Sequence, residues 1–194
     1  PIALLAPPFY RRSMRDGFTV VLPFYNEEKF LAATLDSLAR QTLPPRRMVL
    51  VDNASTDGSP AIARDFAARN PSLNAEVRRE ARAGKASALA LGLSNIEEGF
   101  VATCDADTYY PPRYLAGAAR IFARDDKIDA AIAFGVASAD PAASRWTRLK
   151  GAAMARLAPR QTHGGGYGQC FRASALRRAG GFSPERWPYC LMDH

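Results

Sequence analysis

Residues 18–52, "FTVVLPFYNEEKFLAATLDSLARQTLPPRRMVLVD", decide the fold because they combine two strand patterns and one helix pattern in immediate succession. The opening "FTVVLP" and the closing "RMVLVD" are apolar and rich in β-branched residues, which is typical of buried strands. Between them, residues 26–41 place apolar side chains at helical spacing, and Asn26 is expected to cap this helix. We therefore expect a strand, a helix and a second strand along this stretch.

The same alternation continues through most of the chain. Ser59 and Pro60 are expected to open a helix as its cap and first-turn proline, and Asn70 to end it. Further elements are expected at residues 75–80 (strand), 84–99 (helix), 100–105 (strand), 111–126 (helix), 128–137 (strand) and 144–158 (helix). Because alternating strands and helices imply crossover connections, we expect an α/β fold with a Rossmann-like, mostly parallel sheet and helices on both faces.

The domain organisation follows from what the pattern lacks. The chain has no internal repeat and no low-complexity linker, which favours a single domain over residues 1–194 with an N-terminal extension at about 1–16. The alternation changes after residue 140, and a glycine-rich stretch, "HGGGYGQCF", follows at 163–171. We expect a mixed edge of the sheet in this part of the chain.

Composition bounds the class of protein. Of the 194 residues, 47% are hydrophobic and 23% charged, which is ordinary for a globular domain. No apolar run is long enough to span a membrane, and the opening "PIALLAP" is too short and too proline-rich for a span or a standard signal peptide. The three cysteines lack paired spacing, which argues against a disulfide framework or a zinc site. We therefore expect a reducing, cytoplasmic location.

The net charge of +7 comes almost entirely from arginine, with 22 Arg against 4 Lys. Arginine favours bidentate contacts with phosphates and carboxylates, so the charge fits nucleic acid, an anionic membrane surface or a phosphorylated small molecule. It equally fits an ordinary solvated surface. Because no aromatic-interleaved RNA motif accompanies the arginines, we expect no nucleic-acid partner.

Polar side chains follow three of the expected strands, at the edge where ligands bind in open α/β sheets. The first strand leads into "PFYNEE", the second into "VDNASTDG" with Asp52 and Asn53, and a later one into "CDADTYY" with Asp105 and Asp107. An isolated Asp-x-Asp also fits a turn, but several such ends on one edge favour a divalent-cation site. A dinucleotide site is excluded because no G-x-G-x-x-G turn follows the first strand.

Five segments together resemble the family 2 glycosyltransferases in order and rough spacing. They are "VVLPFYNEEKFLAATLDSLARQT", "MVLVDNASTDGS", "GKASALALGL", "CDADTYYPP" and "GQCFRASALRRAGGF" with the later "LMDH". The resemblance covers about residues 18–194. It implies a GT-A fold and inverting transfer of a sugar from a nucleotide-sugar donor, more often UDP- than GDP-linked, with Mn²⁺ or Mg²⁺. It also implies that the C-terminal part of the domain is missing from this chain.

The resemblance assigns nucleotide-sugar binding to nine positions: Pro23, Tyr25, Asn26, Glu28, Asp52, Asn53, Lys85, Asp105 and Asp107. Tyr25 would lie against the nucleobase, and Asp52 and Asn53 would read its edge. Many relatives have a second aspartate where this chain has Asn53. Asp107 would ligate the metal that bridges the diphosphate, and Asp105 would bond the ribose and support the metal.

The resemblance places the general base at Asp193, in "LMDH", where it would take a proton from the acceptor hydroxyl. The family has a glutamate beside this aspartate, whereas this chain has Met192. The alternative is therefore a weakened or inactive nucleotide-sugar binding module. The expected acceptor is a glycan or a lipid-linked carrier, which leaves open a peripheral association with the inner face of the cell membrane.

Overall fold

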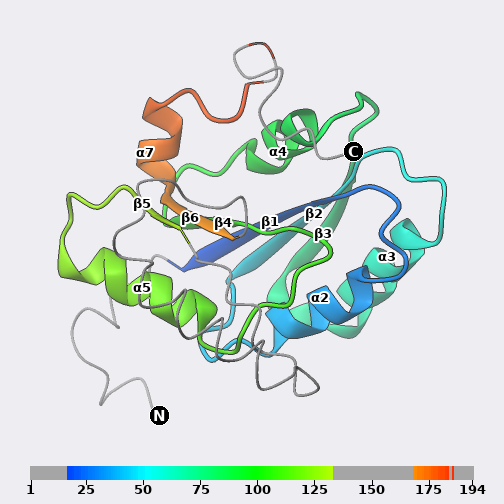
Figure 1. Ribbon diagram of the computed structural model, residues 1–194, viewed down its shortest axis with the longest axis horizontal. Coiled ribbons are helices and arrows are strands. Elements are labelled where there is room, and N and C mark those ends of the chain that lie inside the picture. The colour runs from blue at the N-terminus through cyan, green and yellow to red at the C-terminus, as the bar shows by residue number, and fades with distance from the viewer. Residues whose placement is uncertain (1–16, 133–167, 184, 186–194) are drawn as a thin grey trace, which may run out of the picture.

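The computed structural model of the chain describes residues 17–132, 168–183 and 185, and these form an α/β fold around one sheet (Figure 1). The six described strands lie in the order β3-β2-β1-β4-β6-β5. Their bounds are Phe18–Phe24 (β1), Arg47–Asp52 (β2), Ala75–Arg79 (β3), Phe100–Thr103 (β4), Ala130–Ile132 (β5) and Gln169–Arg172 (β6). The first four are mutually parallel, whereas β6 runs antiparallel to both β4 and β5. The predicted mostly parallel sheet with a mixed edge is confirmed.

Helices cover both faces of the sheet, as predicted. Figure 1 shows α4 and α7 on one face and α2, α3 and α5 on the other. Their bounds are Leu31–Ala39 (α2), Ser59–Arg69 (α3), Lys85–Leu93 (α4), Tyr114–Arg124 (α5) and Ala173–Arg178 (α7), with a short 3-10 helix, η2, at Pro71–Leu73. None of the described helices is long and apolar enough to cross a membrane.

Strand β1 shows why the sequence is continuously apolar at this point. Val20, Leu22 and Phe24 belong to the core on the side of α2, α3 and α5, whereas Val21 belongs to the core under α4. All four side chains are at most 3% exposed. A strand buried on both faces cannot alternate apolar and polar residues, which is the pattern expected of a central parallel strand.

Helix α4 lies directly against the sheet. A Cβ added at Gly92 would stand 2.4 Å from Cγ1 of Val21 and 3.1 Å from Cγ2 of Val51, so only glycine permits this approach. Beyond this contact, the Arg78 guanidinium donates to the carbonyl of Leu91, at 2.9 Å, at the C-terminal end of the helix. The sheet therefore fixes the position of α4 and of the side chains that it carries.

Two predicted helix caps are wrong. Asn26 has a left-handed backbone, with φ +54°, and its Oδ1 accepts the Thr56 N–H at 2.8 Å, so α2 begins only at Leu31. Gly58 holds the cap position of α3, and Ser59 Oγ instead accepts the Glu27 N–H at 2.8 Å. In both cases the polar side chain joins two loops rather than closing its own helix. The first-turn proline of α3 and its end at Asn70 are confirmed.

The remaining differences concern element lengths. Helix α4 ends at Leu93 rather than at residue 99, because Ser94 leaves the helical conformation with ψ 133° before the chain enters β4. The strand predicted at 128–137 is described only as Ala130–Ile132. The helix predicted at 144–158, most of the glycine-rich stretch and Asp193 lie outside the described residues.

Candidate active site

The parallel order of β3, β2, β1 and β4 brings their carboxyl ends to one edge of the sheet. The register pairs Phe24 with Asp52, and the Cys104 N–H continues the ladder by donating to the carbonyl of Val21. The residues that follow these strands therefore emerge side by side. They include Tyr25 after β1, Asn53 after β2 and Asp105 after β4.

The Asp105 carboxylate already has a cationic partner. Lys85 Nζ lies 2.6 Å from Asp105 Oδ1, and the two side chains are 29% and 19% exposed. Lys85 is the first residue of α4, where the helix dipole disfavours a positive charge, so the carboxylate offsets that cost. The ammonium group keeps two further hydrogens for an anion such as a phosphate.

Asp107 is exposed and extends from the same loop. Its Oδ1 accepts a bond from Thr108 Oγ1 at 3.3 Å. A carboxylate with this much open coordination space is suited to a hard cation that takes its other ligands from phosphate and water. The described residues contain no group of three or more His, Cys, Asp or Glu able to hold a metal by themselves.

A third carboxylate belongs to this edge. Glu27 is half-buried, and burial raises the pKa of its carboxyl group, with the negative charges of Asp107, Asp57 and Asp105 adding to the effect. Glu27 therefore shares an electrostatic environment with the Asp105–Asp107 pair. Oxygen ligands without histidine or thiolate fit Mg²⁺ or Mn²⁺ rather than zinc or copper.

Glu28, which we predicted as a binding residue, uses its side chain within the loops. Its Oε2 accepts the Gly58 N–H at 3.1 Å, and its own N–H donates to Asp57 Oδ2 at 3.1 Å. It thereby ties the loop after β1 to the loop after β2. The positive φ of Asn26 turns the chain just before these two glutamates, and the sequence gives no signal for which of the two side chains bonds the loop after β2.

The nucleotide-binding positions predicted after β1 and β2 differ in exposure. Pro23 is buried within β1 opposite Val51, whereas Tyr25 is 58% exposed and presents its ring to solvent. Asp52 is 3% exposed, and its Oδ1 accepts the Ser55 N–H at 2.8 Å. An exposed aromatic ring beside a nearly buried carboxylate can stack on a base and accept a hydrogen bond from its edge.

Asn53 bonds the segment that leads into α4. Its Nδ2 donates to the carbonyls of Glu80, at 3.2 Å, and Arg82, at 2.6 Å. Its Oδ1 accepts the Gly84 N–H at 2.9 Å. Both amide hydrogens are thus occupied, and one lone pair of Oδ1 remains for a ligand.

Two buried polar residues hold the carboxylate loop, and the sequence analysis missed both. Tyr110 Oη accepts the Asp105 N–H at 2.7 Å, which closes the loop on itself. Gln41 donates through Nε2 to the carbonyls of Tyr110 and Pro111 and accepts the Leu115 N–H through Oε1. The sequence reads Tyr109-Tyr110 without distinguishing the two rings, yet the first is 53% exposed and the second 3%.

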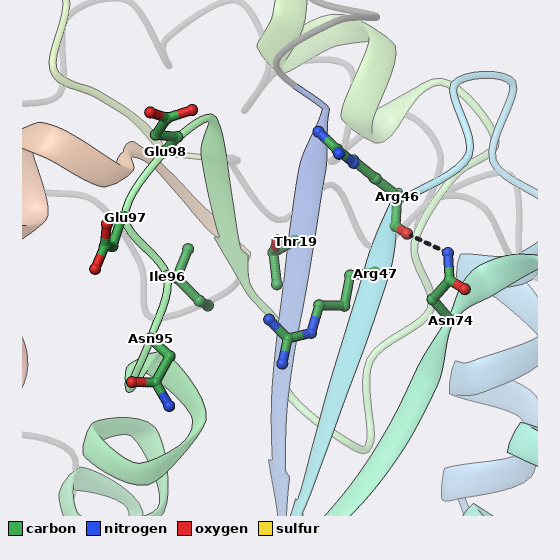
Figure 2. Close-up of a pocket in the computed structure, with 8 residues that line it drawn as sticks. All are labelled: Thr19, Arg46, Arg47, Asn74, Asn95, Ile96, Glu97 and Glu98. Atoms are coloured by element: carbon green, nitrogen blue, oxygen red, sulfur yellow. Dashed lines mark hydrogen bonds between the residues drawn. The ribbon is translucent and has the colours of Figure 1, made fainter.

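A separate pocket lies at the opposite, amino-terminal edge of the strands (Figure 2). It has a volume of about 360 Å³ and is lined by Thr19, Arg46, Arg47, Asn74, Asn95, Ile96, Glu97 and Glu98. None of the predicted binding residues lines it. The carboxyl edge, rather than this pocket, therefore gathers the chemistry expected from the sequence.

Comparison with known proteins agrees with the fold. Mannosyltransferase PcManGT from Pyrobaculum calidifontis, solved in complex with GDP-Man and Mn²⁺, superposes with a TM-score of 0.69 and 28% identity over 93% of this chain and 55% of that one. The fold is thus the α/β fold of GT-A glycosyltransferases. Residues 19–180 match glycosyl transferase family 2, and the chain belongs to that family.

Curated relatives match over about half of the chain. The uncharacterized glycosyltransferase EpsJ of Bacillus subtilis (strain 168) is 33% identical over 91 residues, which are 47% of this chain and 26% of that protein. The undecaprenyl-phosphate 4-deoxy-4-formamido-L-arabinose transferase of Edwardsiella ictaluri (strain 93-146) is 36% identical over 104 residues, 50% of this chain and 31% of that one. The chain thus covers only about a quarter to a third of these relatives' lengths.

Proposed function

We propose that this chain binds the nucleotide-sugar donor in an inverting glycosyltransferase that transfers the sugar to a glycan or lipid-linked acceptor. The observation that carries the proposal is the Asp105–Asp107 pair at the carboxyl edge, with Lys85 Nζ 2.6 Å from Asp105. A cation and a diphosphate placed there would partner the carboxylates and the ammonium group at the same time. Family membership supports the same reading.

The nucleoside would occupy the side of the edge formed by β1 and β2. Tyr25 would stack on the base, and Asp52 and the free lone pair of Asn53 Oδ1 would accept hydrogen bonds from its edge. We propose a UDP-sugar as the donor. The solved complex of PcManGT with GDP-Man makes a GDP-sugar the alternative to test.

Asp105 and Asp107 would hold Mn²⁺ or Mg²⁺, which when bound offsets the charge of the leaving nucleoside diphosphate. Lys85 would donate to phosphate oxygens from the start of α4. Asp193 would accept the proton of the acceptor hydroxyl as that oxygen attacks the anomeric carbon in line. Met192 beside it favours the second candidate, a binding module with weak or no transferase activity.

The acceptor side rests on the relatives alone. The Edwardsiella relative is named undecaprenyl-phosphate 4-deoxy-4-formamido-L-arabinose transferase, and the undecaprenyl phosphate in that name supports a lipid-linked acceptor. On this proposal the chain works in the cytoplasm and meets the membrane peripherally.

Donor binding is tested by isothermal titration of UDP and of GDP, each with Mn²⁺, into the wild-type chain and into Asp107→Asn. We expect one nucleotide to bind the wild type and the variant to lose at least tenfold in affinity, because a neutral amide is a poor metal ligand. Asp65→Asn is the matched control, since Asp65 is exposed on α3 and pairs with Arg69 at the surface. Failure of both nucleotides to bind the wild type would reject the proposal.

Catalysis is tested by Asp193→Asn, assayed for both donor binding and sugar transfer. The proposed base role predicts that binding is kept and transfer is lost. Unchanged turnover would remove Asp193 from this role. Donor binding by the wild type without transfer to any acceptor would favour the binding module instead.

A further inference from the structure

Asn53 makes contacts that an aspartate in its place could not make. Its side chain is 7% exposed, and its carboxamide spans the backbone of residues 80–84 with two donated bonds and one accepted bond. A carboxylate has no hydrogen to donate, so it would face the carbonyl oxygens of Glu80 and Arg82 without a bond to either. An asparagine at position 53, rather than an aspartate, therefore suits the hydrogen-bonding groups of residues 80–84.

That segment connects β3 to α4 and ends at the residue preceding Lys85. It begins as an extension of the sheet, where the Glu80 N–H donates to the carbonyl of Asp52 at 2.8 Å. It ends at Gly84, which has φ +111°, a conformation that favours glycine. Within the segment, the Arg82 N–H donates to Glu80 Oε1 at 2.8 Å, and the three bonds to Asn53 join the segment to the loop after β2.

A short chain of contacts leads from Asn53 to the carboxylate pair. Asn53 bonds the Gly84 N–H, Gly84 precedes Lys85 at the start of α4, and Lys85 Nζ lies 2.6 Å from Asp105. The far end of α4 is fixed by Gly92 against the sheet. Asn53 holds the start of α4, which is the end of the helix that carries the Lys85 side chain.

We propose that Asn53 is a positioning residue, which sets Lys85 against the diphosphate by clamping residues 80–84, in addition to reading the nucleobase. This inference rests on the proposed function for its effect on binding. The clamp itself can be measured without any ligand, so the two can fail separately.

The test compares Asn53→Asp and Asn53→Ala with the control Asn74→Asp. Asn74 also donates through Nδ2 to a backbone carbonyl, that of Arg46 at 3.1 Å, but it lies at the opposite edge of the sheet (Figure 2). Hydrogen–deuterium exchange of the amides of residues 80–87 is measured without ligand, after a thermal melt has confirmed folding. The dissociation constant of UDP with Mn²⁺ is measured on the same samples.

We expect exchange in residues 80–87 to accelerate about tenfold or more in both Asn53 variants, because two or three of the hydrogen bonds that hold this segment closed are lost. The Asn74 control leaves this segment unchanged. UDP binding weakens about tenfold in the Asn53 variants. Exchange at the wild-type rate would overturn the clamp, whereas accelerated exchange in a protein whose wild type binds no nucleotide would overturn only the proposed function.

A double-mutant cycle with Lys85→Ala separates positioning from direct contact. If Asn53 acts through Lys85, removing Lys85 costs clearly less affinity in the Asn53→Ala background than in the wild type. Additive losses would mean that Asn53 touches the nucleotide independently, and would overturn the positioning role. If Asn53→Asp fails to fold, the proposal is still tested by Asn53→Ala, because alanine introduces no charge.

Discussion

Replacement of Gly92 by alanine is expected to destabilise this chain, although alanine normally stabilises a helix. The added Cβ would stand 2.4 Å from Cγ1 of Val21, whereas carbon atoms in contact prefer about 3.5–4.0 Å. Val21 is 0% exposed, and its β-branched side chain has a stiff χ1, so it cannot turn aside. Helix α4 would have to move outward by roughly 1 Å.

The size of the effect follows from two opposing terms. Overpacking of a well-packed core costs about 1–3 kcal/mol. Replacing a glycine inside a helix by alanine returns roughly 0.5–1 kcal/mol, and Gly92, one residue before the end of α4, returns no more than that. The net change in the free energy of unfolding is therefore a loss centred on about 1 kcal/mol, within a range of roughly 0–2.5 kcal/mol, and the central value corresponds to a melting temperature lower by about 2–4 °C in a domain of this size.

Gly117, in α5, is the matched control because it is also a glycine within a helix. A Cβ at Gly117 meets no described atom within 4 Å, so Gly117→Ala is expected to stabilise the chain by roughly 0.5–1 kcal/mol. Equilibrium urea unfolding of both variants measures the difference. A Gly92→Ala variant as stable as Gly117→Ala would refute the close approach of α4 to the sheet.

Three further predictions concern the site and the core. Glu27→Gln is expected to raise the melting temperature relative to the wild type at about pH 7, but not below the ordinary carboxyl pKa of 4.5. Because the pKa of Glu27 is raised in the folded state, its ionisation costs stability as the pH rises, and glutamine removes that cost. The same difference from the wild type at both pH values would contradict this. Tyr110→Phe leaves the Asp105 N–H without its acceptor and is expected to cost about 1–3 kcal/mol in urea unfolding, whereas Tyr109→Phe, at an exposed ring, should cost nearly nothing; equal losses would argue against the loop contact. Burial raises the pKa of the Cys170 thiol to about 12 and that of Cys104 well above its usual value, so both thiols are expected to resist N-ethylmaleimide in the native chain and react after denaturation, which peptide mass spectrometry would show; rapid native modification would mean that this core opens.

The features that depend on residues close together in the sequence were predictable. Apolar runs bounded by glycine, proline and polar residues identified the strands and helices, and their alternation implied the parallel order. The Asp105–Asp107 pair stood out because two carboxylates at a buried strand end have a local cost. The helix starts were less predictable, because Asn26 and Ser59 can each bond either their own helix or a neighbouring loop.

Side-chain direction at the site depended on contacts between distant segments. Glu27 and Glu28 are adjacent and chemically identical, yet the negative charge of Asp107 helps to raise the pKa of Glu27, whereas the Glu28 carboxylate accepts the Gly58 N–H. Asn53 looked like a ligand-reading residue, and its two bonds to carbonyls of residues 80–82 became visible only once β2 and β3 lay side by side.

By itself, the sequence determined the fold class, the edge of the sheet that carries the polar groups, and the family to which the chain belongs. Those features depend on periodicity and on residues near one another in the chain. The tertiary structure decided which of two neighbouring glutamates bonds Gly58, which of two neighbouring tyrosines bonds the Asp105 N–H, and how Lys85 comes within 2.6 Å of Asp105 across 20 residues of sequence. Such choices are settled by hydrogen bonds and close packing between segments that only folding brings together.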